Sequence, residues 1–249
     1  MVRSLFCVLF LMSMAPVVLA ASGEEVLNLA GAGAVVSTSP YAGVKTKTMA
    51  LPFLSVEYKD LYIQGVEAGY RFYKNGDWTL SAVVAPRFMG YSSEDSSALK
   101  GMEDRERSMD AGLKVDYALP WNELTLSGKV LTDTLSRSDG TACGLFLHRA
   151  FKGKYFRLLL SGGARYESKS LVDYYYGVRD SEARAGRPAY EPHGEVDPFA
   201  DAVFTFGISE KLIVVTMLGV ESLGSEIRKS PIVDESYVLS AAAGLTYKF

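Results

Sequence analysis

Serine, aspartate and glutamate are so abundant in this chain of 249 residues that their proximity alone indicates no catalytic site, whereas histidine is scarce. Histidine is the usual general base near neutral pH, and the chain has only His148 and His193. His148 stands beside Arg149 near the end of an alternating segment, and His193 lies between Pro192 and Gly194. Neither histidine has a nucleophile at a spacing that defines a hydrolase, so we expect no catalytic residue.

Metal and cofactor sites are equally hard to build from this sequence. The chain has two cysteines, Cys7 and Cys143, and no His/Cys cluster has the spacing of a zinc site. Five acids between residues 94 and 106 are expected to form a solvated loop rather than a cation site. Gly31-Ala32-Gly33 precedes no helix and no Lys-Ser/Thr pair, so it is not a phosphate loop. We therefore expect no metal and no cofactor.

Composition excludes other classes of protein and favours extended structure. The formal net charge is −3, from 29 acidic and 26 basic side chains, which argues against a nucleic-acid partner because such proteins concentrate basic residues on one face. The chain is rich in aromatic residues and glycine, with 15 Tyr, 12 Phe and 23 Gly. This balance is typical of half-exposed strands and excludes a disordered chain.

The first twenty residues have the three zones of a secretory signal peptide. A basic start at Arg3 precedes an apolar run over residues 5–19, and small residues follow at Ala20 and Ala21. We predict a signal peptide over residues 1–20 and a mature domain over 21–249. Cleavage would remove Cys7, leave Cys143 alone and so exclude an intramolecular disulfide.

The mature part alternates apolar and polar residues with a period of two. The clearest segments are 107–119, 156–167 and 237–249. No apolar stretch reaches the roughly 20 residues of a spanning helix, and the longest covers only residues 212–220. Strands of about 10 to 13 residues match those that cross a bilayer when tilted.

Aromatic residues near the strand ends suit a membrane interface. They are Tyr62, Trp78, Phe88, Tyr117, Tyr155, Tyr166, Tyr237 and Tyr247. His148 is expected at the same interface. Only a closed ring of strands satisfies every backbone group inside hydrocarbon. The fold class predicted is therefore all-β, a closed antiparallel transmembrane β-barrel, with a secreted β-sandwich as the alternative.

Eleven strands can be read directly from the alternation. They cover residues 26–36, 48–58, 61–73, 78–91, 107–119, 123–132, 141–149, 155–167, 197–208, 212–221 and 237–249. Single-chain bacterial barrels have an even number, so we expect twelve strands, with ten as the alternative and residues 171–178 as a place for the twelfth. Short connections are expected on the periplasmic side and long ones outside.

The inward faces carry both signs of charge in near balance. They are Glu67, Arg71, Arg87, Asp110, Lys114, Asp116, Lys129, Arg157, Arg165 and Glu167. In a small barrel such groups lie close enough to pair and fill the interior. We therefore expect little or no general porin conductance.

Several segments resemble the MipA/OmpV family of outer-membrane proteins. The most specific are Ser230-Pro231-Ile232-Val233-Asp234, and Asp173-Tyr174-Tyr175-Tyr176-Gly177-Val178 with Glu182-Ala183 and Arg187-Pro188-Ala189-Tyr190. Supporting segments are Leu51-Pro52-Phe53-Leu54 with Tyr58, Gly69-Tyr70, and Leu99-Lys100-Gly101-Met102 with Arg105. The terminal Tyr247-Lys248-Phe249 resembles the signal read by the barrel-assembly machinery, with Tyr247 and Phe249 as its aromatic residues.

The resemblance implies a non-enzymatic barrel in the outer membrane of a Gram-negative bacterium, surrounded by outer-membrane lipid. The family role it implies is a scaffold that joins a periplasmic murein transglycosylase to a murein synthase. A surface adhesin is an alternative, with Tyr174, Tyr175, Tyr176 and Tyr190 of the long loop 168–196 as contact residues. A small solute channel is the remaining alternative.

Overall fold

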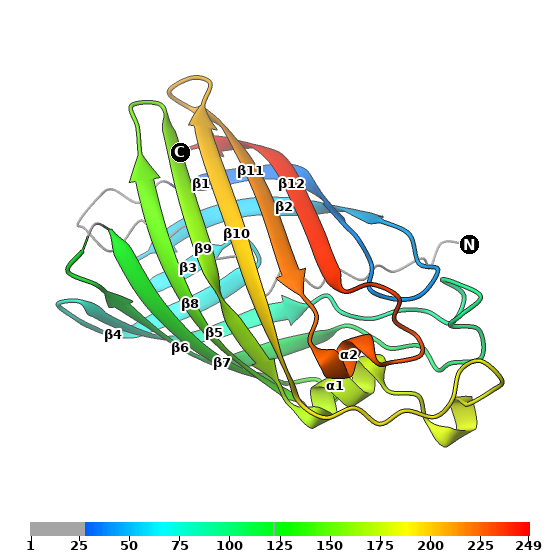
Figure 1. Ribbon diagram of the computed structural model, residues 1–249. Helices are drawn as coiled ribbons and strands as arrows, with labels where there is room; N and C mark the ends of the chain where they lie inside the picture. The colour runs from blue at the N-terminus through cyan, green and yellow to red at the C-terminus, as the bar shows by residue number, and fades with distance from the viewer. Residues whose placement is uncertain (1–27, 122) are drawn as a thin grey trace.

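Twelve antiparallel strands form a closed barrel in the computed structural model, which describes residues 28–121 and 123–249 (Figure 1). The predicted fold class and the predicted strand number are both confirmed. The predicted signal peptide over residues 1–20 lies outside the described residues. The strands are β1 Leu29–Ser37, β2 Lys47–Tyr58, β3 Leu61–Gln64, β4 Glu67–Asn75, β5 Trp78–Arg87, β6 Ser108–Ala118, β7 Leu124–Asp133, β8 Thr141–Lys152, β9 Phe156–Glu167, β10 Glu195–Gly207, β11 Leu212–Ser222 and β12 Tyr237–Lys248.

The alternation in the sequence becomes two faces of the barrel wall. On β12, Val238 and Ser240 are buried, whereas Tyr237 and Leu239 are exposed on the outer face. Successive side chains of a strand point to opposite faces of a sheet, so one face of each strand meets lipid and the other meets the lumen. Pairing of β1 with β12 closes the ring and leaves the barrel no free sheet edge at that position.

The strand absent from the sequence prediction lies inside the segment 61–73. This segment is a hairpin of β3 and β4 that turns at Gly65, where φ is +62°. Glycine adopts this left-handed backbone without the steric cost of a Cβ. The prediction of a strand at residues 171–178 was wrong, because this segment contains helix α1, Lys169–Tyr176. Its buried residues recur at helical spacing, as Leu171, Val172, Tyr175 and Tyr176.

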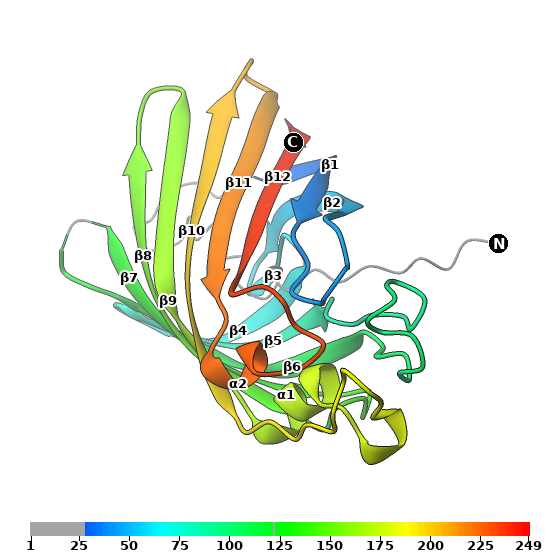
Figure 2. The ribbon, with the colours of Figure 1, turned by 45° about the vertical axis from the view of Figure 1, so that its right-hand side comes forward.

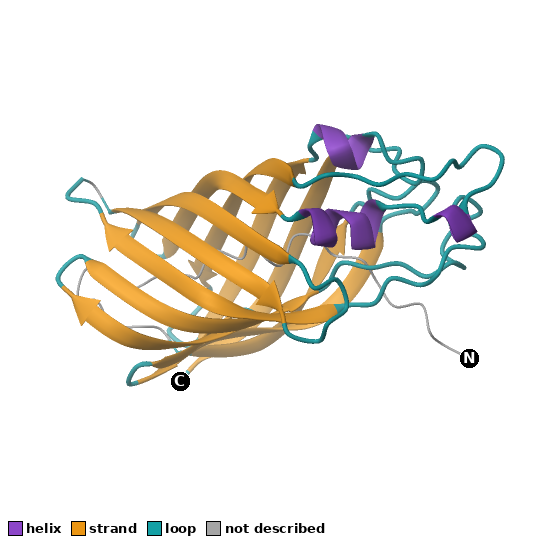
Figure 3. Cartoon of the chain, turned by 90° about the horizontal axis from the view of Figure 1, so that it is seen from below, coloured by secondary structure: helices purple, strands orange, loops and turns teal. Residues whose placement is uncertain are grey.

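The two ends of the barrel differ in the length of their connections. Long loops, α1, the 3₁₀ turn η2 (Asp180–Glu182) and helix α2 (Ser225–Arg228) gather at one end, and short turns lie at the other (Figures 2 and 3). Long loops mark the extracellular end and short turns the periplasmic end of such barrels. No helix in the described part of the chain is long and apolar enough to span a membrane.

The extracellular connections pack into a cap with its own apolar core. Tyr41, Leu99, Tyr175, Ile227 and Ile232 come from four different connections and are fully buried in one cluster. The same cluster continues into the lumen through inward side chains of the wall. Contiguous packing of this kind excludes water, so the cap closes the outer end of the barrel.

Most of the segments that carry the family resemblance meet in this cap. Ser230 donates its hydroxyl proton to the Tyr176 carbonyl at 2.6 Å, and Ala42 donates its N–H to the Ile232 carbonyl at 2.8 Å. Arg187 donates to the Ala98 carbonyl at 2.6 Å. Packing between the extracellular connections therefore explains the loop motifs that carry the family resemblance.

A notch interrupts the upper part of the wall beside the short strand β3. β3 pairs with β2 only over residues 55–58 and with β4 only over residues 67–70. In the described part of the chain, no strand pairs with β2 over residues 47–54 on this side. β2 and β5 border the notch and carry Pro52 and Pro86, and proline in a sheet is confined to edges.

Apolar side chains, and not backbone pairing, fill the notch region. Met49, Leu51, Val66 and Phe88 are half-buried and pack against the apolar residues of the lumen. Phe88 therefore does not belong to the aromatic girdle expected from the sequence. Tyr62 does not belong to it either, because its ring is buried inside the barrel.

Candidate functional site

One side of the lumen is held by buried ion pairs. Arg87 and Asp110 lie on adjacent strands, are fully buried, and approach within 2.6 Å. Lys129 pairs with Glu67, and Lys114 lies 3.1 Å from Asp116. Arg165 on β9 pairs with Glu221 on β11 and lies 3.4 Å from Glu167. Arg71 on β4 donates a hydrogen bond of 2.8 Å to Glu57 on β2. Charges in a low-dielectric interior are tolerated when they are paired in this way.

The expected pairing of inward charges is found, but the charges do not fill the whole interior, because another part of the lumen is apolar. The apolar luminal cluster consists of Leu29, Phe53, Val203, Ile213, Val215 and Met217, which project inward from β1, β2, β10 and β11. β11 is apolar on both faces, since Leu212, Leu218 and Val220 are exposed on its outer face. The apolar residues occupy the periplasmic part of β10 and β11, whereas the buried Asp197, Asp201 and Glu221 place charged groups farther toward the extracellular end of the same two strands.

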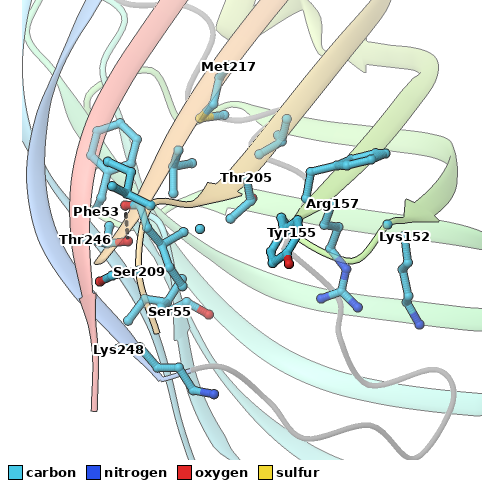
Figure 4. Close-up of a pocket in the computed structure, with 18 of the residues that line it drawn as sticks. Phe53, Ser55, Lys152, Tyr155, Arg157, Thr205, Ser209, Met217, Thr246 and Lys248 are labelled. Atoms are coloured by element: carbon cyan, nitrogen blue, oxygen red, sulfur yellow. Dashed lines mark hydrogen bonds between the residues drawn. The ribbon is translucent and has the colours of Figure 1, made fainter. Parts of the chain in front are cut away.

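A cavity of about 790 Å³ lies against the apolar luminal cluster (Figure 4). It lies toward the periplasmic end, because the turns at residues 153–155 and 207–210 contribute to its lining. It also reaches Leu54 and Gly65 at the lower border of the notch. Cavities of 300–1,000 Å³ are typical of small-ligand sites.

Cationic side chains surround the mouth of this cavity. Lys152, Lys154, Arg157 and Lys248 line it, against one acidic residue, Glu210. Figure 4 shows the charged ends of Lys152, Arg157 and Lys248 at one end of the cavity and Met217 at the other. The arrangement combines an apolar interior with a positively charged entrance.

His148 is buried inside the lumen and not at the membrane interface, because it takes an inward position on β8. Its cross-strand neighbour is Ser161, whose neighbour on β10 is Asp201. The serine thus stands between the histidine and the acid, whereas a hydrolytic triad needs the histidine in the middle. Neither ring nitrogen of His148 and neither carboxylate oxygen of Asp201 has a hydrogen-bond partner. His148, Ser161 and Asp201 therefore do not form a catalytic triad.

The remaining candidates for chemistry are accounted for by local contacts. His193 is exposed and donates its backbone N–H to Glu226. In the acidic loop, Asp95 pairs with Lys47 at 2.7 Å, and Asp104 accepts hydrogen bonds from Ser92 and Ser93. Among residues 28–121 and 123–249, no group of three His, Cys, Asp or Glu side chains could hold a metal ion.

The four tyrosines predicted as loop contacts have structural partners in the cap. Tyr175 and Tyr176 are fully buried, so these two rings do not face a partner. Tyr174 is half-buried, and its hydroxyl accepts a hydrogen bond from the Glu106 N–H. The Tyr190 hydroxyl donates a hydrogen bond of 2.8 Å to the Glu226 carbonyl. Burial is the reason that the tyrosine-rich segment does not present the surface expected from its composition.

The Arg105–Glu182 pair is the centre of polar contact in the cap. Burial alone would raise the pKa of Glu182. The Glu103 N–H and the Arg105 guanidinium outweigh that effect, and they hold the pKa below its usual value of 4.5. Burial likewise opposes the charge of Arg105, but the nearby Tyr91 and Glu182 raise its pKa. Both groups are therefore charged near neutral pH.

Comparison with known protein families shows to which family this barrel belongs. The sequence model of the family described as "MltA-interacting protein MipA" matches residues 30–249, which covers nearly all described residues. The chain belongs to this family. The family resemblance found in the sequence is confirmed.

The relatives matched by this chain include several that are named outer membrane proteins. The chain is 27% identical over 225 residues to the MltA-interacting protein of Escherichia coli K12, covering 88% of this chain and 89% of that protein. It is 25% identical over 222 residues to the putative outer membrane protein YiaT of the same strain, with the same coverage. It is 29% identical over 182 residues to OmpV of Vibrio cholerae, covering 72% and 70%. The protein is an outer-membrane β-barrel.

A solved outer-membrane channel is among the structures to which this chain is similar. The COG4313 outer membrane channel of Pseudomonas putida F1 is 11% identical, with a TM-score of 0.47, and the match covers 92% of this chain and 98% of that one. The family name and the barrel fold are consistent with the Gram-negative outer membrane expected from the sequence. The expected assembly residues Tyr247 and Phe249 are exposed on the outer wall and at the chain end.

The cavity and its charged mouth were absent from the sequence prediction. Its apolar wall had one detectable signal, the predominantly apolar run 212–220, because a strand with apolar residues at consecutive positions has two apolar faces. Three of the four basic residues of the mouth, Lys152, Lys154 and Arg157, come from the β8–β9 hairpin, and Lys248 comes from the end of β12. The sequence places the first three together, but only the closed barrel brings Lys248 beside them.

Proposed function

We propose that this MipA-family barrel is a non-enzymatic anchor that holds periplasmic murein enzymes, a transglycosylase and a synthase, at the outer membrane. The observation that carries the proposal is the asymmetry of the barrel. Its outer end is closed by a packed cap, and its accessible cavity and exposed turn residues lie at the periplasmic end. The name of the Escherichia coli relative, MltA-interacting protein, supports a murein enzyme as the partner.

Exposed apolar side chains at the periplasmic turns supply contact points. Trp121, on the β6–β7 turn, is 65% exposed, and Ile208, on the β10–β11 turn, is 60% exposed. Tryptophan is among the residues that dominate the binding energy of protein interfaces. The turns are short, so we propose that these anchors, together with the rim of the cavity, form the docking face.

The proposal predicts that a murein transglycosylase and a murein synthase co-purify with the barrel after cross-linking of intact envelopes. Trp121→Ala combined with Ile208→Asp should reduce the retained enzymes at least fivefold. Leu135→Ala is the matched control, since Leu135 is 53% exposed on an extracellular turn. Retention of neither enzyme above the level of an unrelated barrel would overturn the anchor. Equal retention by all variants would overturn the docking face.

An adhesin and a solute channel have less support. The adhesin was based on a tyrosine-rich loop whose Tyr175 and Tyr176 are buried. A channel needs a continuous aqueous path, whereas the cap core and the fully buried Arg87–Asp110 pair occupy the outer part of the lumen. Neither alternative explains why the accessible space faces the periplasm.

A further inference from the structure

The periplasmic cavity has the composition of a site for an amphiphile. Its inner wall is mainly apolar, led by Phe53, Ile213 and Met217, with Thr205 and Thr246 among its few polar members. Each apolar group that such a wall removes from water contributes to binding in proportion to its area. An elongated hydrocarbon segment is the ligand that this wall favours.

The mouth adds a requirement for negative charge. Four cationic residues line the cavity against the single carboxylate of Glu210. Lys152 lies 3.2 Å from Glu123, so part of this charge is balanced locally. Lys154 lies in the β8–β9 turn and Lys248 at the end of β12, and both residues line the cavity. A carboxylate or phosphate at the entrance is favoured by charge complementarity.

The level of the cavity along the barrel matches that of the inner leaflet of the membrane. The charged mouth lies at the level of the periplasmic turns, where the headgroups of that leaflet also lie. The cavity reaches Leu54 and Gly65, which border the notch where backbone pairing of the wall is interrupted. Hydrocarbon on the outside and the apolar luminal cluster on the inside are separated there by side chains such as Val66.

We propose that the periplasmic cavity binds a single-chain anionic lipid of the inner leaflet. The acyl chain lies along the apolar luminal cluster, and the headgroup is held by Lys154, Lys248 and their neighbours. Ile208 and the rim of the cavity belong to both this site and the proposed docking face, whereas Trp121 belongs only to the docking face and Met217 only to the lipid site. Trp121→Ala and Met217→Trp therefore allow the anchor role and the lipid site to fail independently.

Native mass spectrometry of the purified mature barrel in a non-ionic detergent tests the proposal, with laurate, dodecyl phosphate and dodecanol as probes. Laurate and dodecyl phosphate should bind at one molecule per barrel, at least tenfold more tightly than dodecanol. Equal binding of dodecanol and laurate, or absence of any bound probe, would overturn the proposal.

Two pairs of variants separate the site from general effects. Met217→Trp fills the cavity and should weaken laurate binding at least tenfold, whereas Leu218→Trp, which places the same ring on the lipid face, should change it less than twofold. Val203→Trp repeats the first test if Met217→Trp fails to fold, as judged by heat-dependent gel mobility. Equal effects at the inward and outward positions would overturn the cavity assignment.

The charge of the mouth is tested in the same way. Lys154→Glu with Lys248→Glu should weaken laurate binding at least tenfold. Lys59→Glu with Lys211→Glu makes the same change of charge on turns of the same end, at residues that do not line the cavity, and should have less than a twofold effect. Equal losses in both double variants would show a general electrostatic effect and overturn the role assigned to the mouth.

Discussion

The guanidinium of Arg105 donates hydrogen bonds of 2.9 and 3.0 Å to both carboxylate oxygens of Glu182, and thereby joins two extracellular loops. Arg105 also donates to the Tyr174 carbonyl at 2.7 Å, and Glu182 accepts the backbone N–H of Glu103. One buried, bidentate ion pair thus ties the β5–β6 loop to the segment that follows α1.

Replacing Glu182 by Gln should loosen the cap and leave the barrel intact. Loss of one partner leaves Arg105 buried without its counter-charge, which costs about 3 kcal/mol. Protease cleavage of the loops on whole cells should accelerate, while strand content by circular dichroism stays unchanged. Glu191→Gln, which removes the exposed partner of Lys169, is the control and should leave the cleavage rate unaffected. Unchanged cleavage in both variants would show that the pair does not hold the cap.

Acidification should loosen the same contact. The pKa of Glu182 is lowered in the folded protein, so its contribution to stability is present above its usual pKa of 4.5 and is lost as the pH falls through the folded value. Hydrogen exchange of residues 95–105 and 178–187, corrected for intrinsic rates, should rise in the wild-type protein as the pH falls below 4.5 through the lowered pKa of Glu182. In the Glu182→Gln variant this rise should be absent. A rise of the same size in both proteins would assign the effect to other groups.

The β3–β4 hairpin depends on a glycine under an aromatic ring. The Tyr62 ring lies directly over Gly69, where a Cβ would collide with it. Gly69→Ala should therefore destabilise the barrel by about 1–3 kcal/mol through overpacking. Adding Tyr62→Leu should recover part of the loss in urea unfolding experiments. If Gly69→Ala were equally destabilising with and without Tyr62, the ring would not be the cause.

The Arg87–Asp110 pair tests how charge is accommodated in the lumen. Arg87→Met leaves Asp110 buried and unpaired and should cost about 3–5 kcal/mol, whereas Arg87→Met with Asp110→Leu should be close to neutral. Unfolding in urea, followed by the fluorescence of Trp78 and Trp121, measures both. A double variant as unstable as the single one would mean that the pair has a role beyond mutual compensation.

The period-two pattern was enough to predict the barrel, because the lipid face must be apolar at every second residue. It failed at residues 61–73, where the alternation continues across the Gly65 turn and hides a hairpin. It also failed at Tyr175, since a short helix and a strand are both compatible with a short run of apolar and aromatic residues.

The candidate site was beyond the reach of the pattern for a different reason. Period two separates two faces of a strand, but it does not say which strands become neighbours across a lumen. The apolar luminal cluster gathers residues from β1, β2, β10 and β11, and its charged mouth gathers residues from β8, β9 and β12 and from the turn after β8. Their proximity follows from ring closure and register, which are properties of the whole barrel.

Ion conductance of the mature protein in planar bilayers tests most directly the claim that the cap closes the outer end of the barrel. We predict no stable conductance steps at neutral pH. The positive control is a variant in which a Gly-Ser linker replaces residues 169–193 and so removes α1 from the cap. This variant should conduct ions, which shows that the barrel inserts into the bilayer. A large, stable and weakly selective pore in the wild-type protein would contradict a barrel whose lumen opens only to the periplasm.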